Sequence, residues 1–296
     1  MRNAMQLMLA ASVLALAVPA WAQTAPDHPS ITVGGQTYTP LSIVTRNMGT
    51  KEDQTTALGP FHVIGNIYYV GTRTLSSYLI VTPQGNILVD STYERNVPTI
   101  AKSVAKLGFK FSDIKILLGN HAHADHQEGD ALVKQMTGAQ VVAMEDDIPA
   151  LQFMTPEGKE HPLDRIIHDG DKVTLGGTTL TAHLTAGHTR GCTSWTTTAS
   201  ENGKTYNVLI GCSLRAPAVI APGTQAEFER SFKYVRTLPC EVQLGDHGSQ
   251  FNLLEKYARL KAGGPNPFID PKNCFHEADI EEAMFKAILA EQQKRD

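Results

Sequence analysis

The chain has 296 residues, of which 42% are hydrophobic and 19% charged, and its formal net charge is −4. This balance provides no basic surface of the kind that binds nucleic acid, so we expect no nucleic-acid partner and a small diffusible substrate. The length would allow two domains, but nothing in the chain resembles a linker, and we expect a single domain over residues 23–296.

Residues 1–22 have the order of a secretory signal peptide. Arg2 is followed by an apolar run, and Ala20–Ala22 fits the small-x-small cleavage rule. Pro19 ends the apolar run before it reaches the roughly 20 residues that a membrane span needs. We therefore expect cleavage before Gln23, no membrane anchor afterwards, a periplasmic or secreted location, and a monomer.

The mature chain begins with a polar, turn-rich stretch, residues 23–59, which we expect to be an extension with little regular structure. Short runs rich in β-branched and aromatic residues then predict two groups of strands. The first group is 61–63, 67–71, 77–81, 86–89, 114–118 and 140–144, and the second is 172–175, 178–184, 193–198, 206–210 and 241–244.

Helical patterns accompany both groups of strands. The predicted helices are 97–107, 130–136, 146–153, 225–237, 253–262 and 277–293. Residues 156–168 have no periodic pattern and are predicted to be a loop. Two blocks of strands, each followed by helices, predict an α/β fold in which two sheets pack face to face with helices outside.

Four potential metal ligands occur within the six residues from His121 to His126, between a predicted strand and a predicted helix. Residues two apart in an extended segment project to the same side, so His121 and His123 can reach one metal. Asp125 and His126 lie at the turn into the helix and are directed elsewhere. This spacing predicts two adjacent metals.

Zinc in proteins takes three or four donors, so the cluster needs further ligands. His188 and His247 each follow a predicted strand end and have glycine neighbours, and we expect both to join the site. The remaining candidates lack this context and are predicted to be structural or surface residues: His161, His168, His183 and His276.

Export to an oxidising compartment makes disulfides possible, and four cysteines allow three full pairings that sequence cannot separate. We favour Cys240 with Cys274, in the C-terminal third. Cys192 and Cys212 lie in apolar segments and are predicted to be buried free thiols.

The stretch His121–His126, with Ala186-Gly187-His188-Thr189 and Gly245-Asp246-His247-Gly248, resembles the metallo-β-lactamase superfamily. The αββα sandwich of that superfamily agrees with the predicted element order. Further segments are similar to the third subclass of class B β-lactamases, and together they cover nearly all of the mature chain. These segments are 66–72, 168–171, 175–180, 191–195 and 265–268.

The resemblance implies two zinc ions per chain and hydrolysis of the β-lactam amide bond of penicillins, cephalosporins and carbapenems by a metal-bound hydroxide. Asp125 is implied to orient the hydroxide and Ser213 to position the substrate. We also predict that Arg215 binds the substrate carboxylate. The implied ligands are His121, His123 and His188 for the first ion, and Asp125, His126 and His247 for the second.

Cys212 occupies the place after Gly211 where glyoxalase II-like and lactonase-like hydrolases have a metal-bridging aspartate, and this favours a lactamase. A cysteine ligand, as in the first subclass, is a weaker alternative because the second ion already has three donors.

Glu128, Asp130 and Asp246 depart from the family pattern. They either add negative charge near the second zinc or point into solvent. Two other functions stay open: hydrolysis of a lactone, ester or thioester, and zinc binding without catalysis.

Overall fold

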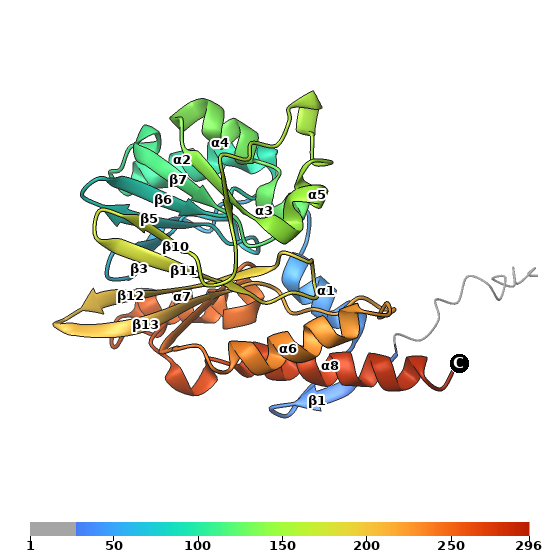
Figure 1. Cartoon of the computed structure of the whole chain (residues 1–296). Helices are drawn as coiled ribbons and strands as arrows, with labels where there is room; N and C mark the ends of the chain where they lie inside the picture. The colour runs from blue at the N-terminus through green and yellow to red at the C-terminus, as the bar shows by residue number, and fades with distance from the viewer. Residues whose placement is uncertain (1–27, 296) are drawn as a thin grey trace, which may run out of the picture.

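The structure is a computed structural model that describes residues 28–295. Two main β-sheets lie face to face, and helices cover their outer faces (Figure 1). The predicted signal peptide lies outside the described residues. Within the described part of the chain, none of the helices combines the length and apolar character that crossing a bilayer requires.

The first main sheet has seven strands in chain order. The strands from β3 to β6 are antiparallel, and those from β6 to β9 are parallel. Their bounds are β3 Phe61–Ile64, β4 Ile67–Tyr69, β5 Tyr78–Thr82, β6 Gly85–Val89, β7 Ile114–Leu118, β8 Gln140–Met144 and β9 Arg165–Ile167.

The second main sheet has five strands, again in chain order, and only its last pair is parallel. A separate hairpin, β1 Ile31–Val33 with β2 Gln36–Tyr38, precedes both sheets. The bounds of the five strands are β10 Lys172–Leu175, β11 Thr178–Leu184, β12 Thr193–Glu201, β13 Lys204–Gly211 and β14 Val242–Gly245.

Helices α2 and α4 pack on the outer face of the first sheet, whereas α6 and α8 pack on the second (Figure 1). Helix α2 shows why: Ile100 and Val104 are buried on one side, and Lys102 on the other side is exposed. The α-helices are α1 Pro40–Met48, α2 Val97–Lys106, α3 Ala124–Gln127, α4 Asp130–Thr137, α5 Ile148–Leu151, α6 Thr224–Val235, α7 Leu253–Ala262 and α8 His276–Gln292.

The main core lies between the two sheets. Val89 and Leu118 of the first sheet join Trp195 and Ile210 of the second in one buried cluster. Leu88, which points to the opposite face, belongs to the cluster under α2 and α4. Strands buried on both faces in this way read as continuous apolar runs, which is why their positions are visible in the sequence.

Six strands, three in each main sheet, have their carboxyl ends at one edge of the sandwich. They are β6, β7 and β8 of the first sheet and β11, β13 and β14 of the second. Each is followed by a loop that carries a polar or ionisable side chain. The loops after these strand ends form the candidate site.

The predicted strands and most predicted helices are present, but two predictions about irregular segments were wrong. The stretch 23–59 was expected to have little regular structure, but its described part, residues 28–59, contains β1, β2 and α1. Residues 156–168 include the edge strand β9. A strand of three residues is too short to show an alternating apolar and polar pattern. Helix α1 begins at a capping box formed by Thr39 and Ser42. The helix predicted over 146–153 is only one turn, α5.

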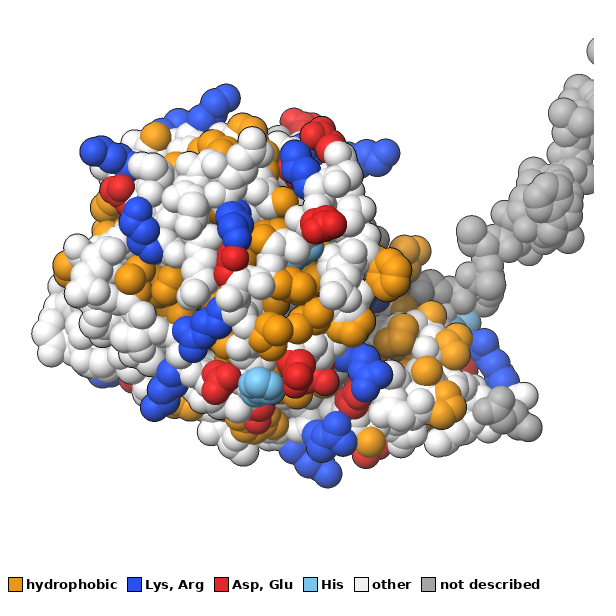
Figure 2. Space-filling view, turned by 45° about the horizontal axis from the view of Figure 1, so that its top comes forward, with side chains coloured by type: hydrophobic (Ala, Val, Ile, Leu, Met, Phe, Trp, Pro, Cys, Tyr) orange, Lys and Arg blue, Asp and Glu red, His pale blue; other side chains and the backbone are white. Residues whose placement is uncertain are grey.

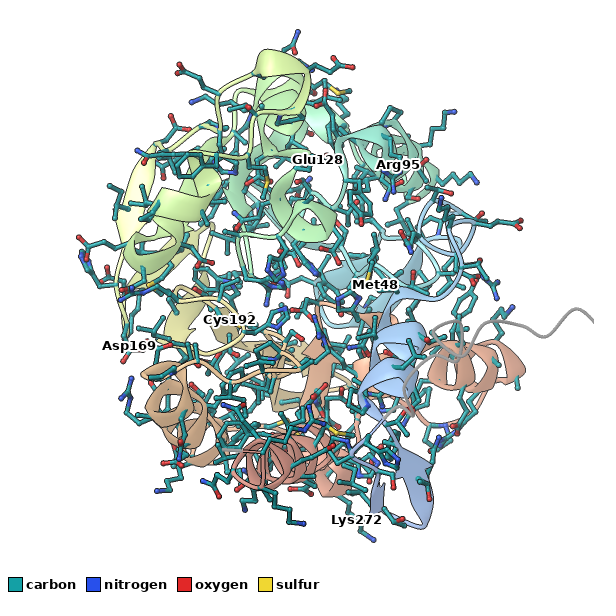
Figure 3. The ribbon with its side chains drawn as sticks, turned by 90° about the vertical axis from the view of Figure 1, so that its right-hand side faces the viewer. Met48, Arg95, Glu128, Asp169, Cys192 and Lys272 are labelled. Atoms are coloured by element: carbon teal, nitrogen blue, oxygen red, sulfur yellow. A yellow bond between two sulfur atoms is a disulfide. The ribbon has the colours of Figure 1, made fainter. Side chains whose placement is uncertain are left out.

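The two disulfides confirm one cysteine prediction and correct the other. Cys240 and Cys274 are paired, as predicted. Cys192 and Cys212 are not free thiols but form the second disulfide. They lie just beyond Trp195 and Ile210, the last paired residues of the β12–β13 hairpin, so the register brings them together. Figure 3 shows Cys192 near the middle of the molecule, between the two halves.

Replacing both Cys240 and Cys274 by serine is expected to lower the free energy of unfolding by about 3 to 4 kcal/mol, because the disulfide closes a loop of roughly 35 residues in the unfolded chain. Urea titration without reductant measures this. An unchanged unfolding midpoint in the variant would contradict the prediction.

Candidate metal centre

Two histidines from the stretch after β7 and one from the loop after β11 lie around one point. His123 is extended (φ −110°, ψ 152°) immediately before α3 begins, so His121 and His123 project together. His121 Nε2 lies 3.1 Å from His123 Nδ1. The ring centroid of His188, in the loop after β11, lies 4.8 Å from each of the other two rings. We call these three residues the first triad.

A second set of three donors lies beside the first. Asp125 Oδ2 is 3.4 Å from His126 Nε2 and 3.7 Å from Nε2 of His247, which follows β14. We call Asp125, His126 and His247 the second triad. The two triads touch, because the rings of His121 and His126 have centroids only 4.1 Å apart. The structure thus brings together all six predicted ligands.

Both triads fit a divalent metal such as zinc. Donors at 2.0–2.2 Å from a tetrahedral zinc are about 3.3–3.6 Å from one another, close to the separations here. Within each triad, one donor atom from every residue lies within 4.8 Å of the others. His126 Nε2 is buried and has no hydrogen-bond partner among residues 28–295. A bound cation would satisfy this nitrogen.

Carboxylates hold the outer nitrogens of two ligand histidines. His126 Nδ1 lies 3.1 Å from Asp90 Oδ2, and the other Asp90 oxygen accepts a hydrogen bond from the Asn120 backbone N–H at 2.8 Å. His121 Nδ1 lies 3.3 Å from Asp246 Oδ2. Such outer carboxylates orient metal-binding imidazoles and raise their basicity.

Backbone carbonyl oxygens hold the outer nitrogens of two more histidines. His188 Nδ1 donates to the carbonyl oxygen of Arg215 at 2.9 Å, and His247 Nδ1 donates to that of Asn47 at 3.2 Å. Each triad therefore contains one histidine supported by a carboxylate and one supported by a carbonyl. The Nε2 atoms of all four rings are left to face the centre.

Electrostatics differ between the triads. Burial lowers the pKa of His121 well below its usual value and, with repulsion from His123, lowers that of His188 to about 3. Burial also opposes the charged form of His126, but Asp125 and Asp90 outweigh it and raise the pKa of this histidine. Without metal, the first triad is neutral at pH 7, whereas the second triad retains a proton on His126.

Asp147, after β8, connects the two loops that carry the first triad. One carboxylate oxygen accepts from the Ala122 backbone N–H at 2.8 Å and from the Thr189 hydroxyl at 2.9 Å. The other accepts from the Gly191 N–H at 2.7 Å. A Cβ at Gly191 would lie 2.6 Å from the Asp147 side chain, so this close approach requires glycine. Asp147 thereby fixes the spacing of His188 from His121 and His123.

The predicted substrate residues lie at the end of β13. Ser213 is 2% exposed, and its N–H donates to Asp246 Oδ2 at 2.7 Å. Arg215 is half-buried, and its charge helps to lower the pKa of both His123 and His188. Its positive charge therefore acts on the first triad.

The three acidic residues that depart from the family pattern do not point freely into solvent. Asp246 is fully buried beside His121, so its charge acts on the first triad. Asp130 is also buried, where it accepts from Ser91 Oγ at 2.5 Å and faces His161. Glu128 accepts from the Glu94 N–H at 3.0 Å. The contact with Asp130 agrees with the structural role predicted for His161.

Three supporting residues were not predicted from sequence. Asp90 ends a strand and has φ 59°, a conformation that is uncommon outside glycine, so a polar residue at that strand end was the available signal. Asp147 offered only its position after β8. Asn47 acts through its carbonyl, which no side-chain pattern can reveal.

Asp147→Ala is expected to weaken zinc binding at the first triad by about 10- to 100-fold, the range typical of outer contacts. Three buried donors lose their acceptor, and the two ligand loops are no longer connected. Competition with a chromophoric chelator measures the affinity. Asp146→Ala, at the exposed neighbouring position, is the matched control. Equal affinities in the two variants would exclude this role for Asp147.

Comparison with known proteins agrees with this geometry. The family model described as the metallo-beta-lactamase superfamily matches residues 70–201. Among curated proteins, one named "Probable metallo-hydrolase" from Burkholderia pseudomallei strain 1710b is 28% identical over 158 residues. This match covers 48% of the chain and about half, 53%, of that protein.

Solved structures match over a larger share of the chain. The native FEZ-1 metallo-β-lactamase of Legionella gormanii is 41% identical, with a TM-score of 0.76, over 81% of this chain and 98% of the other. BJP-1, a subclass B3 metallo-β-lactamase of Bradyrhizobium japonicum, is 38% identical, with a TM-score of 0.75, over 82% and 98%. The chain therefore belongs to the metallo-β-lactamase superfamily and groups with its subclass B3 members.

Proposed function

We propose that this protein is a zinc-dependent β-lactamase that hydrolyses the amide bond of the β-lactam ring. The observation that carries the proposal is the pair of three-donor triads in contact at one edge of the sandwich. The relatives named above as metallo-β-lactamases support it. Penicillins, cephalosporins and carbapenems share the ring and are the proposed substrate class.

We assign one zinc ion to each triad, because imidazole and carboxylate donors suit zinc. Bound zinc lowers the pKa of water to about 7 and polarises a carbonyl oxygen, so a nucleophile is available at neutral pH without a serine. His123 is exposed, and Asp125 and His188 are half-buried. The triads therefore open toward solvent on one side, where a substrate can approach.

Asp125 is the proposed catalytic residue among the ligands. Burial would raise its pKa, but the charge attraction of His126 and His247 holds the pKa well below the usual range. The surroundings of Asp125 therefore favour its charged form. Oδ2 approaches both second-triad histidines, and Asp125 is the proposed acceptor that orients the attacking water.

Arg215 is the proposed substrate-binding residue, and Ser213 is proposed to help position it. β-Lactams have a carboxylate beside the ring nitrogen, and a guanidinium can bind a carboxylate through two parallel hydrogen bonds. Arg215 forms no salt bridge within residues 28–295, so its charge is free for this use. Ser213 is almost fully buried, so we assign it to positioning the β13 end that carries Arg215.

We further propose that residues 1–22 are removed on export and that residues 23–296 act as a monomeric single domain in the periplasm or outside the cell. On the face drawn in Figure 2, basic and acidic side chains are interspersed and do not form a patch of one sign. This distribution agrees with a small-molecule substrate and no nucleic-acid partner.

Two alternatives are less well supported. A zinc-sequestering protein would close its coordination shells, whereas these triads are open on one side. A lactone, ester or thioester hydrolase would use the same donors. The bridging aspartate expected after Gly211 in such enzymes is replaced by Cys212, whose sulfur is held in a disulfide.

The purified protein is expected to contain two zinc ions per chain and to hydrolyse a chromogenic cephalosporin, with loss of turnover on chelation and recovery on adding zinc. His121→Ala and His247→Ala should each lower both zinc content and turnover, because they affect different triads. Metal analysis after dialysis measures the first result and absorbance the second. Hydrolysis of a thioester or lactone with no cephalosporin turnover would reject the β-lactamase assignment.

Arg215→Ala is expected to lower kcat/KM by roughly 10- to 150-fold through KM, because a charged hydrogen bond contributes about 1.5 to 3 kcal/mol. The Arg215 carbonyl, which holds His188, remains in the variant, so zinc content should not change. Steady-state kinetics on several β-lactams measures the effect. Arg230→Ala, on the exposed side of α6, is the control. An unchanged KM would place carboxylate recognition elsewhere.

A further inference from the structure

The Cys192–Cys212 disulfide lies directly behind a metal ligand. Cys212 Sγ is 3.5 Å from His121 Nδ1, the ring nitrogen that faces away from the first triad. Both cysteines are buried, with exposures of 0% and 5%. His121, Cys192 and Cys212 together offer three donor atoms that lie within 4.8 Å of one another.

Asp246 brings a fourth donor to the same place. Its Oδ2 lies 3.3 Å from His121 Nδ1 and accepts the Ser213 N–H. Its Oδ1 is buried and has no hydrogen-bond partner anywhere in the described chain. A buried carboxylate oxygen without a partner is costly, and it is an oxygen that a cation would satisfy.

We propose that reduction of the Cys192–Cys212 disulfide opens a further metal site behind His121, with Asp246 as the fourth donor. Two thiolates, an imidazole and a carboxylate form a donor set suited to tetrahedral zinc, and the sulfurs also favour softer ions such as Cd²⁺. In the oxidised protein the disulfide sulfurs are not available as thiolate ligands. The disulfide then protects the first triad from this competing site.

The chemistry balances with a dithiol reductant. A protein dithiol gives two electrons and two protons to the disulfide, yielding two cysteine thiols and becoming a disulfide itself. Metal binding releases both thiol protons to solvent, because thiolates are the ligands. The His121 Nδ1 proton moves to Nε2 as that nitrogen leaves the first triad.

Sharing His121 makes the two sites compete, because a neutral imidazole binds a metal through only one of its two nitrogens. A metal bound through Nδ1 removes His121 from the first triad, which then retains only His123 and His188. Reduction should therefore redistribute metal within the protein without unfolding it. This loss of activity rests on the proposed function, but the formation of the new site does not.

The test uses metal-free mature protein, oxidised or reduced with a phosphine, which takes up oxygen from water as it reduces the disulfide and leaves no competing thiol. Co²⁺ is the probe, because thiolate ligation produces a charge-transfer absorption that nitrogen and oxygen donors do not. The expected result is a thiolate band at one equivalent of Co²⁺ in the reduced protein and none in the oxidised protein. Circular dichroism verifies that the fold is retained.

Two double variants separate the disulfides. Cys240→Ser with Cys274→Ser should retain the band after reduction, whereas Cys192→Ser with Cys212→Ser should lose it. His121→Ala in the reduced protein should weaken Co²⁺ binding at the band-forming site. Thiol titration counts the reduced cysteines in each sample.

Three results would overturn the proposal. These are a missing band when all four thiols are titrated, a Cys192–Cys212 pair that resists reduction while the fold is intact, and an equal band in the Cys192→Ser, Cys212→Ser variant. Cephalosporin turnover by the oxidised protein is measured separately. It decides the proposed function alone, because the thiolate band requires no turnover.

Discussion

Five imidazole rings pack around one point because four of them have the outer nitrogen held by a fixed acceptor. A buried imidazole with an unpaired N–H would be costly, and a freely rotating ring would not present Nε2 to a metal. Asp90, Asp246 and the carbonyls of Arg215 and Asn47 supply these acceptors. The inner nitrogens of the first triad then face one another, and those of His126 and His247 face Asp125. Divalent cations between these donors would satisfy both sets.

The position of these acceptors explains why the whole sandwich is needed. They come from the ends of β6, β13 and β14 and from α1, so both sheets and the N-terminal helix must be in place. Arg46 at the end of α1 pairs with Glu277 of α8. The next residue is Asn47, whose carbonyl holds His247. The N-terminal segment thus contributes directly to the geometry of the second triad.

The sequence predicts the candidate metal ligands much better than the residues that hold those ligands in position. Strands buried on both faces and the short spacing from His121 to His126 are local patterns, and glycine-flanked strand ends revealed His188 and His247. The role of Asp147 depends on loops that meet only after folding, and the pairing of Cys192 with Cys212 depends on the β12–β13 register. Composition and periodicity contain neither kind of information.

The two triads would hold a cation for different physical reasons. In the second, Asp125 and Asp90 flank His126 and raise its pKa against burial, so in the metal-free protein a proton occupies the place where a divalent ion would be attracted. The ion replaces that proton and gains the attraction of both carboxylates. The first triad has three neutral rings and lower intrinsic attraction, so its affinity depends on how well its loops are fixed. Asp147 provides that fixation, and Asp246, which is buried behind His121, adds negative charge beside its ring. A change near His121 therefore acts on geometry at the first triad, whereas a change near His126 acts mainly on charge at the second.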